Sequence, residues 1–426
     1  MWMRLAAIAA FALVPRVHAQ VPAPPVALTL DAAIARVAEK HPELQLIDAQ
    51  RPLLQARADA AALRPAMTLG VEVENLLGRG DSRGLQGAET TVSLSGVLER
   101  GGKLDARRLL AQANLDALAP QRATARLDLL AETARRYLAV ARAQAALRIA
   151  TEDIEQRRRA VNGARQRLQA GASPESVLFT AQAMLAQAEL DRDRAITEAA
   201  SARIALAALW GEREPDFDQV TGEPLKLPPL AGFNQLAAQL REAPELAELL
   251  GEERIAQAQL QLARTAGRPD WSWQAGVRDS RADGSTSLVA GFSLPLGSAR
   301  RAAPDIREAE AGLALLPYQR QARQQQLYAT LAEAHGRHAG ARLEVERMQR
   351  DVLPQLAKAE RAAEHAWRAG AASYMEWAQL QALRIEARQR QLDAAIAAHT
   401  ALIEIQRLTG QPMLATSAHV ATESAR

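Results

Sequence analysis

Residues 67–74 read Met67-Thr68-Leu69-Gly70-Val71-Glu72-Val73-Glu74, so apolar residues alternate with polar or small ones. The same alternation recurs at residues 91–98, 271–278 and 287–294. A period of two residues is typical of a β-strand that has one apolar and one polar face. Taken in chain order, these stretches predict two β-hairpins, at about residues 66–98 and 270–295.

The predicted strands are long enough to cross a bilayer when tilted. Four strands would leave two open edges, which lipid does not tolerate, whereas three copies of the chain would supply about twelve strands, within the range of outer-membrane barrels. Trp271 and Trp273 stand where an interfacial aromatic girdle would lie; the alternative for them is a packed core. The alternative for the hairpins is that they cap a soluble helical body.

Helical patterns surround each hairpin. They cover about residues 31–63, 103–169 and 174–209 in the first half, and 233–266, 301–368 and 373–409 in the second. The longest would extend on the order of 100 Å. Apolar or small residues recur every seven positions along both long helices, which is typical of a coiled coil: Leu147, Ile154, Val161 and Leu168, then Val345, Val352, Ala359 and Ala366.

The second half repeats the first at an offset near 200 residues; for example, residues 167–172 are echoed by residues 367–372. Four prolines indicate a linker between the copies. We therefore predict a first repeat at 20–210, a linker at 211–232, a second repeat at 233–410 and a disordered tail at 411–426.

Residues 1–19 have the order of a secretory signal: a basic residue at Arg4, an apolar run, and small residues before Gln20. We expect export and cleavage after Ala19. The chain has no cysteine, so we expect no disulfide, no thiol chemistry and no lipid anchor. Its 52 basic and 49 acidic residues are interleaved, which argues against a nucleic-acid partner. Aromatic residues make up only 4%, as in long helices that pack through small side chains.

The order of these features, present twice, resembles the TolC family of outer-membrane efflux proteins over about residues 28–412. Residues 92–103 read Val92-Ser93-Leu94-Ser95-Gly96-Val97-Leu98-Glu99-Arg100-Gly101-Gly102-Lys103, and Arg107 and Arg108 follow. This stretch resembles the strand-to-helix junction of the branch that serves heavy-metal efflux pumps. The opening, residues 28–34, also resembles the family.

The resemblance implies a mainly α fold with a small β part: a homotrimer with a twelve-stranded barrel in outer-membrane lipid and an α-helical tunnel in the periplasm of a Gram-negative bacterium. Its implied partners are a periplasmic adaptor and an inner-membrane pump of the RND type, and its implied cargo is heavy-metal cations. Two alternatives stay open: an exit channel for type I protein secretion or multidrug efflux, and a periplasmic coiled-coil scaffold or adaptor.

The resemblance also places the periplasmic tip at the turns near residues 170–175 and 369–374. Glycine suits the end of a helix and serine suits the start of the next. The candidate tip residues are Gly171, Ala172, Ser173, Gly370, Ala371 and Ser373, and the two serines are expected to cap the return helices.

Glu376 follows the second turn at a position that resembles an acidic ring residue of the family's constricted entrance. Three copies would form a ring that attracts cations, and Glu175 is a further candidate. The alternative for Glu376 is a solvated residue near a helix N-terminus, where acids are favoured.

Residues that would suggest catalysis are few. His335 and His338 could share a helix face, but zinc sites normally need three or four ligands, so we expect both to be exposed helix residues. No nucleophile elbow or phosphate-binding loop is present in the sequence. We expect no enzymatic activity, no cofactor and no metal site.

Overall fold

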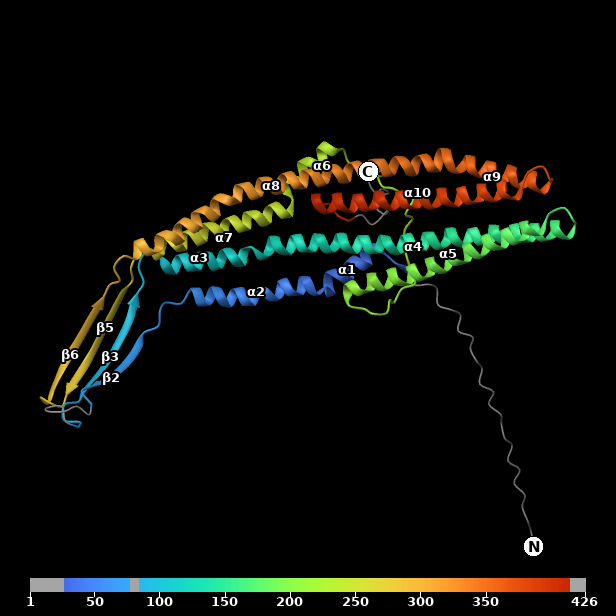
Figure 1. Ribbon diagram of the computed structural model, residues 1–426. Coiled ribbons are helices and arrows are strands. Elements are labelled where there is room, and N and C mark those ends of the chain that lie inside the picture. Colours follow the sequence, from blue (N-terminus) through green and yellow to red (C-terminus); the bar gives the residue numbers. More distant parts are fainter. Residues whose placement is uncertain (1–26, 77–83, 414–426) are drawn as a thin grey trace, which may run out of the picture.

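The computed structural model describes residues 27–76 and 84–413. The expected signal segment, most of the first hairpin turn and most of the expected tail lie outside these residues. Figure 1 shows a long bundle of helices with a small sheet at one end. The fold is mainly helical with a small β part, as expected.

The alternating stretches form one antiparallel sheet. Its strands are β2 (Thr68–Glu74), β3 (Glu89–Leu98), β5 (Trp271–Ser280) and β6 (Ser285–Ser293), in the order β2-β3-β5-β6. The central pair, β3 and β5, joins the two halves of the chain. Among the described residues, β2 and β6 are the edges of the sheet.

The strand register gathers the apolar residues on one face of the sheet. Val71 pairs with Val92, Val92 with Val277, and Val277 with Leu288, so these four side chains form a row across all strands. Because side chains alternate along each strand, the next row on the same side is also apolar, and the rows on the opposite side are mostly polar or small. The residues of that second apolar row are Leu69, Leu94, Ala275 and Ala290. The apolar face is exposed to a large degree; Leu288, for instance, is 87% exposed.

Two long helical hairpins make up most of the bundle. The helices are α1 (Leu30–Lys40), α2 (Pro42–Ala61), α3 (Lys103–Asp116), α4 (Leu118–Gln169) and α5 (Glu175–Ala207), then α6 (Phe233–Gln239), α7 (Pro244–Ala266), α8 (Ser298–Arg347), α9 (Leu353–Arg368) and α10 (Tyr374–Thr409). Short 3₁₀ turns follow α5 and α6. The chain breaks between α1 and α2 at His41, since a residue that precedes proline disfavours helical geometry. None of the described helices is apolar enough over a sufficient length to cross a membrane.

The second long helix is interrupted by a π-helical turn, Met348–Val352, between α8 and α9. This turn lies just before Pro354, which lacks a backbone N–H. The expected seven-residue series therefore fails in this half: Val345 is buried but Val352 is 37% exposed. After the π turn, the buried positions are Glu360, Ala363 and Trp367, because the extra residue per turn rotates the packed face of the helix.

Part of the segment expected to be a linker is packed into the core. Its β4 strand (Gln219–Val220) pairs in parallel with β1 (Ala27–Leu28). Phe217 is buried, and the Tyr137 hydroxyl lies 3.0 Å from the carbonyl oxygen of Leu28 and 2.7 Å from that of Thr221. Residues 211–232 thus contribute to the same core as α1 and α4.

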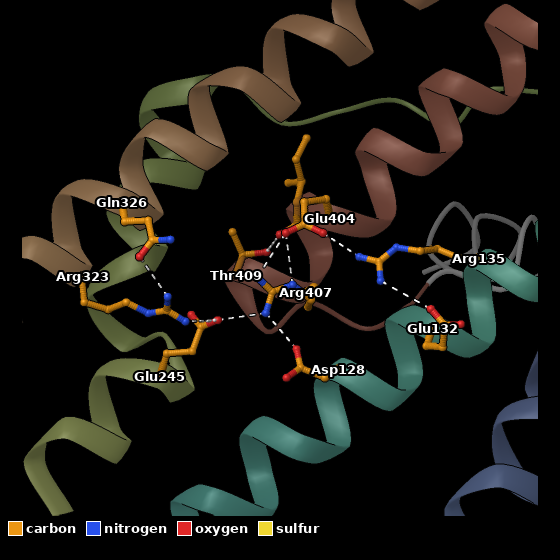
Figure 2. A network of polar contacts seen from close by, with 10 residues as sticks. Asp128, Glu132, Arg135, Glu245, Arg323, Gln326, Glu404, Arg407 and Thr409 are labelled. Carbon is orange, nitrogen blue, oxygen red and sulfur yellow. Dashed lines mark hydrogen bonds and ion pairs between the residues drawn. The ribbon is translucent and has the colours of Figure 1, made fainter. Parts of the chain in front are cut away.

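A charged network joins the end of α10 to both halves of the chain (Figure 2). Arg407 donates to Asp128 on α4 at 2.8 Å, to Glu245 on α7 at 2.9 Å and to Glu404 at 3.1 Å. Arg323 on α8 approaches the same Glu245 carboxylate at 3.4 Å. Burial alone would lower the pKa of Arg407, but Glu404 and Glu245 outweigh it and raise this pKa.

Candidate functional site

The two turns at the end of the bundle opposite the sheet are built alike (Figure 1). Gly171 and Gly370 have φ values of 68° and 80° and end α4 and α9, as expected. After each glycine a backbone N–H bonds back across the last turn, from Ala172 to Arg167 and from Ala371 to Ala366, both at 2.8 Å. This pattern needs a left-handed residue after the helix, which glycine supplies without strain.

The two serines of these turns behave differently. Ser373 caps α10, because its Oγ accepts the backbone N–H of Glu376 at 3.2 Å. Ser173 does not cap α5, so that expectation is wrong. The N-cap position is taken by Pro174, and no side chain bonds to the first turn of α5.

An aromatic cluster fills the space between the two helical hairpins near these turns. Trp367 and Trp377 stack with their rings 4.8 Å apart, and Tyr374 meets both edge-on. Around the rings lie small or short residues, above all from α4, and we call the whole set the tip cluster: Ala160, Val161, Ala164, Ala181, Ala363, Trp367, Tyr374, Trp377 and Ala378. The Trp367 ring lies so close to the backbone of Gly163 on α4 that a Cβ at this position would be 2.9 Å from the ring.

Arg167 on α4 joins the first turn to the second. It donates to the carbonyl oxygens of Trp367 at 2.6 Å and Arg368 at 3.0 Å, the last carbonyls of α9. It also donates to Ala172 within its own turn at 3.3 Å. A cation at the C-terminal end of a helix satisfies free carbonyls and favours the helix dipole. Sequence reasoning missed this contact, because it depends on the approach of two turns that lie about 200 residues apart in the chain.

A buried polar group lies on the sheet side of the tip cluster, one to two helical turns beyond it along α4. Arg157 donates to Asp153 at 3.1 Å on α4 and to Gln381 on α10 at 3.4 Å. All three residues are less than 10% exposed. Burial raises the pKa of Asp153, and the charge of Arg157 opposes this rise. The network therefore ties α4 to α10 inside the bundle.

The two acidic ring candidates lie in the first turns of the return helices. Glu175 begins α5 and Glu376 lies in the first turn of α10, and both are exposed. Ala172 and Ala371 are exposed beside them, so the tip presents small and acidic residues.

The sheet carries a charged group on its polar face. Arg278 on β5 pairs with Glu74 on β2 and with Glu89 on β3, both at 3.1 Å, and its Nε donates to Thr91 at 3.0 Å. Gln274 further along β5 donates to Ser93 at 3.0 Å. The polar rows are thus linked by side-chain hydrogen bonds across three strands.

The two tryptophans of β5 lie at the end of the sheet that joins the helices. Trp271 is half-buried; the Arg100 guanidinium lies 4.1 Å from its ring centroid and Phe292 meets it edge-on at 5.6 Å. Trp273 is also half-buried and packs on Gly96 of β3. Neither ring belongs to a core cluster of the described residues.

The expectation for the histidines is wrong for His338. This residue is only 2% exposed, and its Nε2 has no hydrogen-bond partner in the described part of the chain. Burial lowers its pKa, and Arg342 adds to the effect. His335 is half-buried and meets Phe233 edge-on at 5.5 Å. Within residues 27–76 and 84–413, no three or more carboxylate or histidine side chains are grouped to hold a metal ion.

Residues 33–212 match the sequence profile of a family described as outer membrane efflux protein. The expected family resemblance is confirmed. The cobalt-zinc-cadmium resistance protein CzcC of Cupriavidus metallidurans is 26% identical to this chain over 323 residues, which are 76% of this chain and 77% of CzcC.

Solved structures of outer-membrane proteins and channels share the fold. CusC superposes with a TM-score of 0.75 at 19% identity and covers 91% of this chain and 93% of its own. VceC, an outer membrane protein of Vibrio cholerae, superposes with a TM-score of 0.71 at 16% identity, and the match covers 90% of this chain and 97% of VceC. The tip turns and the two-faced sheet described above therefore belong to a fold that this chain shares with CusC and VceC.

Proposed function

We propose that this chain is one subunit of a homotrimeric exit duct in the outer membrane, which conducts solutes passively and catalyses no reaction. The observation that carries the proposal is the sheet: four strands with a continuous, exposed apolar face on one side and a hydrogen-bonded polar face on the other. A water-soluble scaffold gains nothing from such a face, because exposed apolar area of this extent favours association.

The open edges of the sheet support closure by other copies. Strands β2 and β6 end the sheet, and lipid does not accommodate unpaired backbone groups. Pairing β6 of one copy with β2 of the next, three times over, gives about twelve strands, an even number found in outer-membrane barrels. Trp271 and Trp273 would then belong to the aromatic girdle at the periplasmic interface.

The helices support a tunnel on the periplasmic side. Helix α4 has 52 residues and extends about 78 Å at 1.5 Å per residue. The tip lies at the far end from the sheet, where a periplasmic adaptor and an inner-membrane pump of the RND type would meet it. The residues offered to the adaptor are Gly171, Ala172, Ser173, Gly370, Ala371 and Ser373. Export through the signal at residues 1–19 completes this placement.

We propose heavy-metal cations as the cargo, on the strength of CzcC, which is named for cobalt, zinc and cadmium resistance. Multidrug efflux or protein secretion through the same duct is the second candidate. Deleting the gene and exposing cells to cobalt, zinc and cadmium salts, dyes and antibiotics separates the two. Sensitivity to dyes and antibiotics without sensitivity to metals would contradict the metal cargo.

We also propose that Glu376, with Glu175 as a second candidate, lines the constricted entrance of the trimer. Both carboxylates are exposed and sit directly after the tip turns. Three copies of one carboxylate around an axis would attract cations and repel anions.

The trimer itself is tested by extraction. Protein taken from outer membranes with detergent should have a mass three times that of the processed chain after correction for bound detergent. A monomer released into the soluble fraction without detergent would contradict the duct and favour the periplasmic scaffold.

A further inference from the structure

We infer that Arg100 and Arg268 form a binding site for the headgroup of an anionic phospholipid, on the apolar face of the sheet where the strands pass into the helices. This inference rests on the proposed function, because it requires the sheet to lie in a membrane. The lipid belongs to the membrane leaflet on the side of the helices. The site assigns a ligand to exposed arginines that the proposed duct does not otherwise use.

Arg100 lies at the rim of the apolar face. It follows the last residue of β3, Leu98, by two positions, so the alternation of the strand places both residues on the same side. Leu98 pairs with Trp271 of β5, and the Arg100 guanidinium carbon lies 4.1 Å from the centroid of the Trp271 ring. A tryptophan ring is the best aromatic partner for a cation. The charge of Arg100 is therefore held beside a ring of the proposed aromatic girdle.

Arg268 supplies a second guanidinium from the connection between α7 and β5. Its side-chain stem packs on the backbone of Gly101, where an added Cβ would lie 2.8 Å from the Arg268 Cβ. The φ of Gly101 is 80°, which also favours glycine at this position. Since Gly101 directly follows Arg100, the two arginine side chains start from neighbouring points of the junction.

The carboxylates of this junction are already engaged by other groups. Asp270 accepts the backbone N–H of Arg100 at 3.0 Å through one oxygen and pairs with Lys103 at 2.7 Å through the other. Both oxygens of Glu99 accept hydrogen bonds from the guanidinium of Arg107. Neither acid is left to neutralise an exposed arginine.

Five exposed arginines of the junction have side chains without a hydrogen bond or a carboxylate oxygen within 4.0 Å, counted over residues 27–76 and 84–413. They are Arg64, Arg100, Arg268, Arg300 and Arg301. Arg64 precedes the first strand of the first repeat as Arg268 precedes that of the second, and both are followed by proline. An anion from outside the chain is the partner that this group of charges fits.

A phospholipid fits the site better than a free anion does. The arginines border an apolar surface, on which Leu98 is 52% and Leu296 is 88% exposed. A guanidinium donates to phosphate oxygens in a fixed fork, while the acyl chains of the same molecule cover the apolar residues beside it. Because both junction acids are engaged, no carboxylate is free to receive the ammonium of a zwitterionic headgroup. The site therefore selects an anionic headgroup.

Assembly of the proposed trimer leaves the site uncovered. Neighbouring copies pair along the edge strands β2 and β6, whereas Arg100 and Trp271 lie at the ends of the central strands β3 and β5. Each subunit thus carries a complete site, on the side of the sheet that faces lipid.

Fluorescence quenching by brominated lipids tests the inference. The processed trimer is reconstituted in vesicles of phosphatidylethanolamine and phosphatidylglycerol, with bromine on the acyl chains of one lipid or of the other. Bromine quenches rings that touch lipid, and Trp210, Trp367 and Trp377 are 3–4% exposed within the helical part of the chain. Quenching therefore reports on Trp271 and Trp273, and the ratio of the two quenching curves gives the preference for phosphatidylglycerol.

We expect the wild-type chain to prefer phosphatidylglycerol about fivefold or more, since each arginine near a membrane surface attracts anionic lipid to about this degree. Arg100→Gln with Arg268→Gln should reduce the preference to about twofold or less. Arg159→Gln with Arg165→Gln removes the same charge from exposed positions of α4 near the tip and is the control that should keep the preference. In the wild-type chain, about 1 M salt should remove most of the preference, because it screens charges beyond about 3 Å.

Equal affinity for the two lipids in the wild-type chain would overturn the inference alone, and so would a glutamine double variant that keeps the full preference. Loss of the preference on adding millimolar inorganic phosphate at constant ionic strength would assign the site to a free anion and overturn the lipid. Arg100→Lys with Arg268→Lys keeps both charges and should keep most of the preference, which separates loss of charge from misfolding. Absence of quenching by either lipid would overturn the proposed function and the inference with it.

Discussion

Arg167 and Trp367 lie 200 residues apart, in the last turns of α4 and α9, and the Arg167 guanidinium bonds to the Trp367 carbonyl oxygen at 2.6 Å. Equivalent ends of two duplicated hairpins thus contact each other, but with different residue types. One copy supplies a cation and the other supplies an aromatic ring and the free carbonyls of a helix end. The duplication has therefore produced a pair of complementary surfaces at the tip.

Gly163 is the most sensitive position of this contact. Gly163→Ala would place a Cβ 2.9 Å from the Trp367 ring, so we expect a loss of about 1–3 kcal/mol in unfolding free energy. Thermal unfolding of the detergent-solubilised protein, followed by circular dichroism, measures it. Gly312→Ala on α8 is the matched control, because its added Cβ meets nothing within 4 Å and alanine is the better helix former by about 0.5–1 kcal/mol. Equal effects at both positions would contradict close packing at Gly163.

Gly276 has a similar role in the sheet. A Cβ there would lie 2.6 Å from the backbone oxygen of Val92 and 2.8 Å from the Ser93 Cβ, and a backbone atom cannot move aside as a side-chain tip can. We expect Gly276→Ala to lower the fraction of protein that assembles into trimers in the outer membrane, several-fold relative to Gly291→Ala. At Gly291 the nearest atom is 3.7 Å away, an ordinary contact. Trimer yield on non-denaturing gels compares the two.

Local patterns were sufficient to predict the strands and most helices. The alternation at residues 67–74 depends only on neighbouring residues, and the pairing of β2 with β3 is predictable because the two strands are consecutive in the chain. The positive φ values of Gly171 and Gly370 were likewise predictable, because only the end of a helix and its next residue are involved.

Features that depend on distant partners escaped sequence reasoning. The burial of His338 arises from packing of α8 against other segments, which a lone histidine does not reveal. Phe217 looked like part of a proline-rich linker, yet it enters a core completed by α1 and α4. Ser173 had the right residue type for a cap, but one following proline was enough to displace the cap position.

Arg407 is expected to be the most important charged residue for stability. Arg407→Met would leave Glu245, which is 7% exposed, with one cation fewer at close range (Figure 2). Removing one partner of a buried ion pair costs about 3 kcal/mol or more, so the unfolding midpoint should fall clearly. Arg390→Ala is the control: its pair with Glu344 is exposed and contributes about 0–1 kcal/mol. A midpoint that both changes shift equally would contradict the role of the network.

His338 makes stability depend on pH. Its folded pKa lies below the usual value of about 6.5 because it is buried, and Arg342, His335 and His399 add positive charge around it. As pH falls below about 6.5 the unfolded chain takes up protons before the folded chain does, so stability is complete above that pH and declines below it. Burial also lowers the pKa of His399. We expect the unfolding midpoint to fall between pH 7.5 and 5, and to fall less in His338→Leu, whereas exposed His365→Gln should leave the slope unchanged.

Substitution of Glu376 tests the proposed entrance ring in single-channel recordings. If three copies of this carboxylate surround the pore, Glu376→Gln removes about three charges from the constriction and should weaken block by divalent or trivalent cations about tenfold or more. Conductance in planar bilayers, titrated with a trivalent cation on the side of the tip, measures this effect.

Glu175→Gln examines the second candidate under the same conditions, and Glu189→Gln, along the side of α5, is the control that should leave block unchanged. The capping bond runs from the backbone N–H of Glu376 to the Ser373 Oγ, so the substitution keeps the start of the helix intact and changes only the charge. Unaltered conductance and block in both Glu376→Gln and Glu175→Gln would place the constriction elsewhere and leave Glu376 as a solvated residue of the first helical turn.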